Sequence, residues 1–402
     1  MKRSFAGMLI PGVVAAAAVL SVHAIAAEVK FADQGVSGAE IVLGTHQDMS
    51  GPLKGWSVPV VNGMRLAIDE VNAAGGIDGR KLRLVVEDSG SDPKKAVLAT
   101  QKLVEKDKIF AMVGAMGSPT VLAPQGYLLD AGVFQLFPFT AAEFTFKLAP
   151  GAAQDRLKFA NLLPYVESTR AAVKYMMQTG KYKSPCLLHQ DDEYGRNVLD
   201  GLTQQLEAMK IQPVGVATYK RGASDFSAQT ARLKATGCDL LVLGTVIRET
   251  IAVMTEAKRT GWDVTVLGAT PTNVPEVPQL GKENVEGLYA AGYLQVPDAA
   301  TATGALKDWL TAYDKRFGIP ANTQAILGYN AVMAFATYAR LAGKELNGAS
   351  LLAALESGKP YADIFRSPPI AFSPTNHLGS TVTQIQQVKD GRWEVVSEGL
   401  TF

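Results

Sequence analysis

Apolar residues recur along the chain in two alternating patterns. Short apolar runs, typical of buried strands, alternate with longer segments whose apolar side chains fall on one face of a helix. Along residues 60–74 the apolar positions follow helical spacing, and Gly75-Gly76 follows as a stop signal. This alternation predicts a parallel sheet. We expect strands at residues 41–44, 82–87, 110–114 and 134–137, and helices at 60–74, 93–107 and 119–131.

The same alternation starts again after Leu162-Leu163-Pro164 and predicts a second α/β unit. Near the end of the chain, Asp390-Gly391 separates two apolar runs, which is typical of a β-hairpin turn. Two α/β lobes with a cleft between them are the simplest assembly. We expect strands at residues 186–190, 214–219, 240–245, 264–267 and 288–293, helices at 167–179, 226–236, 249–260, 302–317 and 325–342 with a further one ending at 209, and hairpin strands at 381–388 and 393–397.

The most informative turn follows the strand expected at residues 110–114. Ser118 is a favoured N-cap residue and Pro119 suits the first helical position, so free backbone N–H groups would face the carboxyl end of the strand. That end of an open α/β sheet is where ligands bind, and a helix N-terminus favours an anion. An ordinary capped helix is the simpler interpretation of this segment taken alone.

Three other residues follow expected strands in the same way. Thr140, after Phe139, has the capping-box spacing to Glu143, so it either only caps a helix or also meets a ligand. Tyr194 follows a run of acidic residues that suits a first helical turn, and it is placed to project into a cleft. Trp56 follows the first strand and is either a ligand-stacking lid or plain packing.

The first residues have the pattern of a secretory signal. Met1-Lys2-Arg3 precedes an apolar stretch over residues 8–22, and Ala24-Ile25-Ala26 supplies small residues for cleavage after Ala26. A membrane anchor is the less favoured alternative, because the stretch is short and interrupted by Pro11-Gly12. The residue directly after the predicted cut is not a cysteine, so no lipid anchor is expected.

Charge and cysteine content narrow the function classes. Lys2 and Arg3 leave with the signal, so the 39 basic residues become 37 against 38 acidic ones, which leaves no electrostatic footprint for nucleic acid. The remaining 376 residues favour two domains. Cys186 and Cys238 each lie beside the start of an expected strand; a disulfide between adjacent parallel strands and two free buried thiols both remain open.

Catalytic signatures are missing from the sequence. It contains no G-x-S-x-G, G-x-x-x-x-G-K-[ST], G-x-G-x-x-G or H-E-x-x-H motif, which argues against an enzyme and leaves no catalytic residue to name. His46, His189 and His377 are scattered singly, so structural histidines are favoured over a metal site. We expect no metal and no cofactor.

Five motifs in order resemble one family. They are Met49-Ser50-Gly51-Pro52, the run of residues 71–77, residues 87–93, Asp192-Glu193-Tyr194-Gly195 and residues 222–227. Together they resemble the leucine/isoleucine/valine-binding family of periplasmic solute receptors, which serve ABC importers for branched-chain amino acids, amides and related compounds. The likeness covers the whole mature chain.

The resemblance implies a fold and its division into lobes. The fold is the type I periplasmic binding protein, an α/β architecture of two Rossmann-like lobes with parallel central sheets joined by three hinge crossings. The crossings would lie near residues 161–164, 288–296 and 367–372. The division is then a signal peptide at 1–26, an N-terminal lobe of 27–161 and 297–367, and a C-terminal lobe of 162–296 and 368–402.

The resemblance also implies a site. A ligand carboxylate would be held by Met116, Gly117 and Ser118, with Thr140 sharing that work beside Phe139. Trp56 and Tyr194 would form an aromatic wall from the two lobes.

Departures from the family bear on the ligand. Thr270 stands where the amino-acid receptors place a glutamate for the ligand ammonium, Val246 replaces an aromatic residue, and Gln324 falls near a usually apolar position. A buried ammonium without a carboxylate is costly. We hypothesise a carboxylate lacking the ammonium, such as an aromatic or keto acid, over an ordinary amino acid. The residues left to supply the missing charge are Asp191, Asp192 and Glu249.

The resemblance implies capture of a small carboxylate by lobe closure and delivery to an ABC permease of the inner membrane. The receptor would be a periplasmic monomer. A sensory receptor of the same fold is the main alternative, and an exported hydrolase is a remote one.

Overall fold

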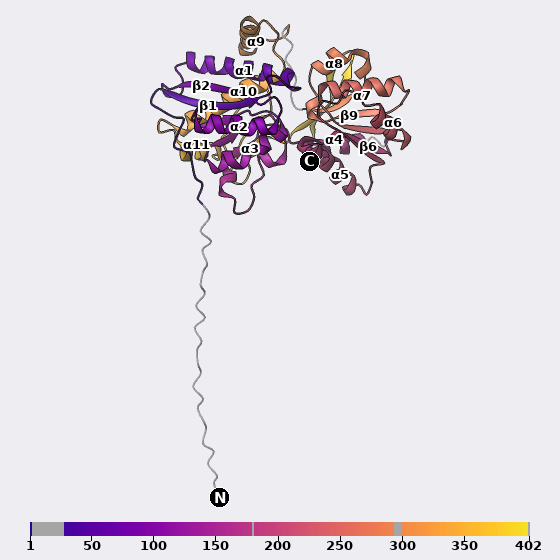
Figure 1. The fold of residues 1–402 in the computed structure, drawn as a ribbon, viewed down its shortest axis with the longest axis horizontal. Coiled ribbons are helices and arrows are strands. Elements are labelled where there is room, and N and C mark those ends of the chain that lie inside the picture. The colour runs from indigo at the N-terminus through magenta and orange to yellow at the C-terminus, as the bar shows by residue number, and fades with distance from the viewer. Residues whose placement is uncertain (2–27, 179–180, 293–299, 401–402) are drawn as a thin grey trace.

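The computed structural model describes Met1 and residues 28–178, 181–292 and 300–400, which form two lobes side by side (Figure 1). The predicted signal peptide, apart from Met1, lies outside the described residues. Each lobe has its own sheet with helices packed on it, so the predicted two-lobed α/β fold is confirmed.

The first lobe contains a parallel five-stranded sheet in the order β2-β1-β3-β4-β5. Strands β1, β3 and β4 are buried, as their apolar runs predict, whereas β2 at the edge of the sheet is only partly buried. The strands are β1 (Glu40–Gln47), β2 (Lys81–Asp88), β3 (Ala111–Val113), β4 (Phe134–Leu136) and β5 (Lys158–Phe159); the helices between them are α1 (Lys54–Ala73), α2 (Pro93–Glu105) and α3 (Ser118–Asp130), with 3-10 turns η1 (Glu143–Thr145) and η2 (Ala153–Leu157).

Three later helices return to this first lobe: α9 (Gly304–Phe317), α10 (Thr323–Ala342) and α11 (Gly348–Leu355). Helix α10 is apolar nearly all round and packs along α1. Two glycines allow this close approach, because a Cβ on Gly63 would lie 2.0 Å from the Ala325 carbonyl and one on Gly328 would lie 2.0 Å from the Val60 carbonyl. Segments far apart in the chain therefore share one core.

The second lobe contains a seven-stranded sheet in the order β12-β11-β10-β9-β8-β6-β7. Its strands are parallel except for the C-terminal hairpin, which adds β11 and β12 antiparallel at one edge. Asp390 and Gly391 have positive φ angles of 50° and 73°, as a tight hairpin turn requires, so the predicted hairpin is confirmed. The strands are β6 (Pro185–Gln190), β7 (Gly215–Tyr219), β8 (Leu240–Gly244), β9 (Thr265–Gly268), β10 (Tyr289–Gly292), β11 (Thr383–Lys389) and β12 (Arg392–Leu400); the helices are α4 (Tyr165–Gln178), α5 (Glu193–Ala208), α6 (Ser227–Ala235), α7 (Ile247–Arg259) and α8 (Glu276–Gly281), with 3-10 turns η3 (Thr270–Thr272) and η4 (Lys282–Val285).

The first helix begins earlier than its apolar pattern predicts. We expected residues 60–74, but α1 starts at Lys54 and includes Pro59. The N–H groups of Trp56 and Ser57 both donate to the Leu53 carbonyl, which starts the helix before the proline. Trp56 therefore lies in the first turn of α1 and not in a loop.

The chain passes between the lobes after β5, after β10 and after α11. The second passage runs into residues 293–299, so the predicted crossing at 288–296 lies partly outside the described residues. Beside the first passage, Ala160 forms a single parallel bridge with Leu378. The exact lobe boundaries stay a prediction.

Cys186 and Cys238 form a disulfide, with their Cα atoms 5.8 Å apart. Strand β6 pairs directly with β8 in parallel register, which brings together the two strand starts beside which the cysteines lie. The alternative of two free thiols is therefore not what the structure shows.

Candidate ligand-binding site

A cavity of about 430 Å³ is lined by residues of both lobes. Its walls come from turns that follow the parallel strands: Met116 follows β3, Phe139 follows β4, Tyr194 follows β6 and Thr270 follows β9. This is the crevice at the carboxyl ends of the strands where open α/β sheets bind ligands.

The first-lobe wall is built at the start of α3. The prediction that Ser118 caps this helix is wrong, because the N-cap position is Gly117, whose φ of 89° favours glycine, and Ser118 is the first helical residue. No side chain caps the helix; the Thr120 hydroxyl instead donates to the carbonyls of Met116 and Gly117. Met116, Gly117 and Ser118 all line the cavity. The N–H of Ser118 belongs to the first turn, which has no acceptor within the helix.

Thr140 lies behind Ser118 and does not line the cavity. It is fully buried, and its hydroxyl oxygen lies 2.6 Å from that of Ser118. The predicted capping box with Glu143 is wrong, because η1 follows Ala142 and has no side-chain cap. The Glu143 carboxylate instead pairs with Lys147 at 2.5 Å. Thr140 can therefore orient the Ser118 hydroxyl without reaching the cavity itself.

The aromatic residues come from both sides of the cavity. Trp56 is half-buried and packs against apolar residues of both lobes. Its Nε1 is buried and has no hydrogen-bond partner among the described residues. Asp48 shapes the preceding loop, because its carboxylate accepts the N–H groups of Gly51 and Leu53.

Tyr194 is 4% exposed and lies near the start of α5. Its hydroxyl donates to the Thr245 carbonyl at 3.0 Å, so the hydroxyl proton is already used within the protein. The ring of Tyr165 meets it edge to face at 4.9 Å. Burial raises the pKa of Tyr165, while hydrogen bonds with Thr140 and Ser118 act in the opposite direction, which places this phenol beside the Ser118 wall.

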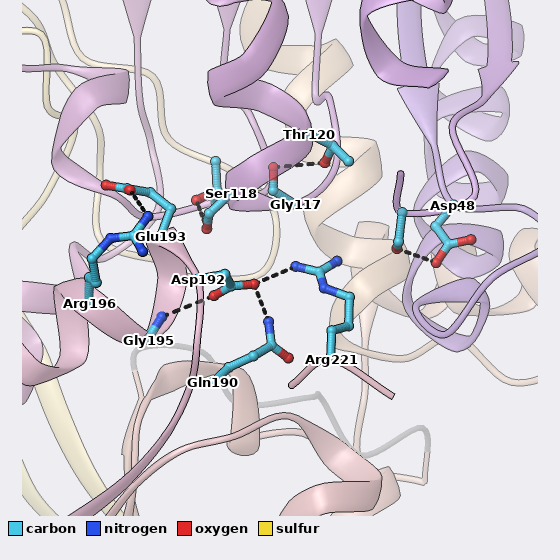
Figure 2. A network of polar contacts seen from close by, with 12 residues as sticks. Asp48, Gly117, Ser118, Thr120, Gln190, Asp192, Glu193, Gly195, Arg196 and Arg221 are labelled. Carbon is cyan, nitrogen blue, oxygen red and sulfur yellow. Dashed lines mark hydrogen bonds and ion pairs between the residues drawn. The ribbon is translucent and has the colours of Figure 1, made fainter. Parts of the chain in front are cut away.

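A charged pair from the second lobe also borders the cavity. Figure 2 shows Asp192 joined by dashed lines to Gln190, Arg221 and the backbone of Gly195. The Arg221–Asp192 contact is 2.8 Å long. Asp192 is thus occupied by protein groups and also caps α5.

The remaining wall residues lie at the ends of β8 and β9. Val246 precedes α7 and Thr270 begins η3; both are half-buried and line the cavity. Glu249, in the first turn of α7, lines it as well. Asp191 is exposed and does not line it.

Polar contacts connect the lobes at one side of the cavity. Glu276 of α8 accepts hydrogen bonds from Asn322 Nδ2 at 2.7 Å and Gln324 Nε2 at 3.3 Å, both at the start of α10. Asn322 is also the N-cap of α10. Glu276 lines the cavity, so this contact links its two walls.

The structure brings together eight of the nine residues predicted for the site and leaves Thr140 one layer behind. Sequence analysis did not single out Tyr165, Arg221 or Glu276. Arg221 lies just after the end of β7, so the same strand-end pattern that predicted the other wall residues also covers it. Glu276 and Tyr165 belong to no strand-end motif, and only the packing of the lobes places them at the cavity.

No metal site accompanies the cavity within the described part of the chain, where no group of three or more His, Cys, Asp or Glu could hold an ion. His189 and His377 each bond a backbone carbonyl through Nδ1 at 2.9 Å. Among the helices that the structure describes, none combines the length and apolarity needed to cross a bilayer.

Comparison with known proteins identifies the family. The sequence profile described as periplasmic binding protein matches residues 40–392. The chain belongs to this family of periplasmic binding proteins. The leucine-specific-binding protein of Salmonella typhimurium is 30% identical over 311 residues, which are 76% of this periplasmic binding protein and 80% of that relative.

Solved structures share the fold. A branched chain amino acid ABC transporter from Thermus thermophilus with bound valine has a TM-score of 0.81 at 18% identity, covering 91% of this binding protein and 98% of that chain. A solute binding protein of an ABC transporter from R. palustris, in complex with benzoate, has a TM-score of 0.77 at 16% identity. The match covers 90% of this binding protein and 97% of that chain. Through its family, this protein is therefore a binding protein and not an enzyme.

Proposed function

We propose that this protein is a periplasmic receptor that captures a small carboxylate by lobe closure and delivers it to an ABC permease. The observation that carries the proposal is a single cavity lined by both lobes at the carboxyl ends of their strands. A ligand that contacts both walls favours the closed arrangement, because only a difference in affinity between two states can shift their populations. The closed form is then the one that a permease recognises.

The wall beside α3 supports a carboxylate as the ligand's polar group. The Ser118 hydroxyl and the first N–H groups of α3 are hydrogen-bond donors at the positive end of a helix dipole. Phe139, Tyr194 and Trp56 would enclose an apolar body. Aromatic acids, keto acids and amino acids all have this form, and the similar structures with valine and benzoate span that range.

The predicted secretory signal and the disulfide support a periplasmic location, because structural disulfides persist in oxidising compartments. Cleavage after Ala26 would release the receptor as a monomer that meets the permease in the inner membrane.

The proposal is tested by isothermal titration of the purified protein, after native mass spectrometry has identified any ligand retained from the cell. We expect micromolar or tighter binding of at least one small carboxylate among leucine, 4-methyl-2-oxopentanoate and 4-hydroxybenzoate. Ser118→Ala should weaken that binding by about tenfold to 100-fold, since hydrogen bonds to charged groups contribute roughly 1.5–3 kcal/mol.

A matched control is Ser227→Ala, which removes the same side chain from the first residue of α6, outside the cavity lining. Its affinity should equal that of the wild type. Unchanged affinity in Ser118→Ala, or no binding of any small carboxylate, would contradict the proposed site.

A further inference from the structure

Asp48 is buried directly after β1 and is 1% exposed. Three hydrogen bonds satisfy its carboxylate. The N–H of Gly51 donates to Oδ1 at 2.5 Å, the N–H of Leu53 donates to Oδ2 at 2.6 Å, and the Ser91 hydroxyl also donates to Oδ2. A buried carboxylate is costly unless such donors converge on it. The loop after β1 is thus folded around one charged group.

The residues that Asp48 holds belong to the first-lobe wall of the cavity. Gly51, Leu53 and Trp56 line the cavity, whereas Asp48 does not. The loop lies close to its support, because a Cβ on Gly51 would lie 2.7 Å from Asp48 Oδ1 and 2.7 Å from the Gly90 carbonyl oxygen. Asp48 therefore supports the wall from behind.

Further contacts connect Asp48 to the start of α1. Its backbone N–H donates to the Ser57 hydroxyl at 2.9 Å. The carbonyl of Leu53 accepts the N–H groups of Trp56 and Ser57 at 2.8 and 2.9 Å, so the residue held by the Asp48 carboxylate also starts the helix. Helix α1 has no side-chain cap of its own. Asp48 therefore fixes the turn that carries Trp56.

We infer that Asp48 is a positioning residue for ligand capture, which acts by holding Trp56 in the cavity wall. The Trp56 ring packs against apolar residues of both lobes, so it keeps its place between them only while the turn beneath it is fixed. The effect of Asp48 on Trp56 follows from these contacts alone. Its effect on the ligand rests on the proposed function.

The test replaces Asp48 by asparagine, which has nearly the same shape. An amide can accept hydrogen bonds at only one of the two carboxylate positions, so the N–H of Gly51 or that of Leu53 loses its acceptor. Ser91→Ala is a milder second variant, because it removes one donor and keeps the carboxylate. Circular dichroism melts establish that each variant is folded. If Asp48→Asn does not fold, Ser91→Ala decides through the same measurements.

Asp88→Asn is the matched control. Asp88 is also a carboxylate at the end of a strand, and it accepts the N–H groups of Met49 and Gly90 at 2.9 Å each. Neither of these two residues lines the cavity. The control therefore disturbs the same pair of loops without releasing a wall residue.

The first measurement needs no ligand. The emission of Trp56 is the difference between each protein and the same protein with Trp56→Phe, which cancels the other tryptophans. We expect Asp48→Asn to shift this difference spectrum to longer wavelength and to increase its quenching by acrylamide. Asp88→Asn should leave both unchanged.

The second measurement is a double-mutant cycle by isothermal titration. The probe is whichever of leucine, 4-methyl-2-oxopentanoate and 4-hydroxybenzoate binds the wild type most tightly. Asp48→Asn should weaken its binding by about tenfold, near the lower end of what a hydrogen bond to a charged group contributes. In a Trp56→Ala background the same substitution should have almost no further effect, because residues that act through one another are not additive.

Two results would overturn the inference. The first is an unchanged Trp56 spectrum in the folded variants, which would leave Asp48 with a role in stability alone. The second is an equal loss of affinity with and without the Trp56 side chain. If none of the three probes binds the wild type and no carboxylate is retained from the cell, the proposed function fails, while the Trp56 spectrum still decides whether Asp48 positions this side chain.

Discussion

His46 is a buried histidine inside β1 and is 1% exposed. Burial lowers its pKa from 6.5 to about 4, and its Nδ1 has no hydrogen-bond partner among the described residues. The folded protein therefore keeps His46 neutral at pH values where the unfolded chain binds a proton. This stabilisation is present above pH 6.5 and is lost as the pH falls toward 4.

We expect His46 alone to lower the free energy of unfolding by about 2 kcal/mol between pH 7 and pH 5. Urea unfolding at pH 7, 6 and 5 measures this for the wild type and for His46→Gln. Between pH 7 and pH 5, the free energy of unfolding of the variant should fall by about 2 kcal/mol less than that of the wild type. His189 and His377 are present in both proteins, so the difference isolates His46. Parallel losses in the two proteins would show that His46 is not the titrating group.

At the scale of elements, α8 and the start of α10 hold the two lobes together through Glu276. The Glu276 carboxylate bonds Asn322 and Gln324 across the cavity, and it also lies at the positive end of the α10 dipole. These hydrogen bonds stabilise the protein only while the two lobes are close together. We therefore expect them to favour a closed arrangement of the lobes, whatever the ligand.

Glu276→Ala should raise the dissociation rate of every bound ligand by about tenfold, since a hydrogen bond to a charged group contributes roughly 1.5–3 kcal/mol before solvent exposure is discounted. Stopped-flow tryptophan fluorescence measures that rate. Glu283→Ala is the control, because it removes an exposed carboxylate from η4 in the same lobe. Dissociation at the same rate in both variants would mean that Glu276 does not hold the lobes closed.

At the scale of the whole molecule, the two lobes differ in covalent support. The disulfide between Cys186 and Cys238 closes a loop of 52 residues within the second lobe. Such a loop contributes about 4 kcal/mol in the chain-entropy model. Neither cysteine belongs to the elements of the first lobe, so its stability does not depend directly on the bond.

Replacing both cysteines by alanine should lower the melting temperature of the second lobe and leave that of the first lobe nearly unchanged. Differential scanning calorimetry of the variant and of the wild type, each with and without a reductant, measures this. The reductant should change only the wild type. Equal shifts of all transitions would mean that the lobes unfold as one cooperative unit.

The alternation of strand and helix could be read from the sequence because apolar periodicity is local, and it located β1 to β4, β6 to β9 and the hairpin within a few residues. The cluster at Met116, Gly117 and Ser118 was predictable for the same reason, since each residue follows a strand of a parallel sheet. Starts of helices were less predictable. Helix α1 includes Pro59 because Leu53 accepts its first N–H groups, a contact that no periodicity reveals.

By itself, the sequence determined the two α/β lobes and the family and predicted a site in the crevice at the strand ends, because these follow from local patterns and from motifs in order. Only the tertiary structure decided which polar side chains pair with one another. It placed Thr140 behind Ser118, paired Asp192 with Arg221, and buried Glu249 in the cavity wall without a hydrogen bond or ion pair to any residue that the structure describes. The partners of a charge depend on which elements pack together, and burial makes those partnerships costly to leave incomplete.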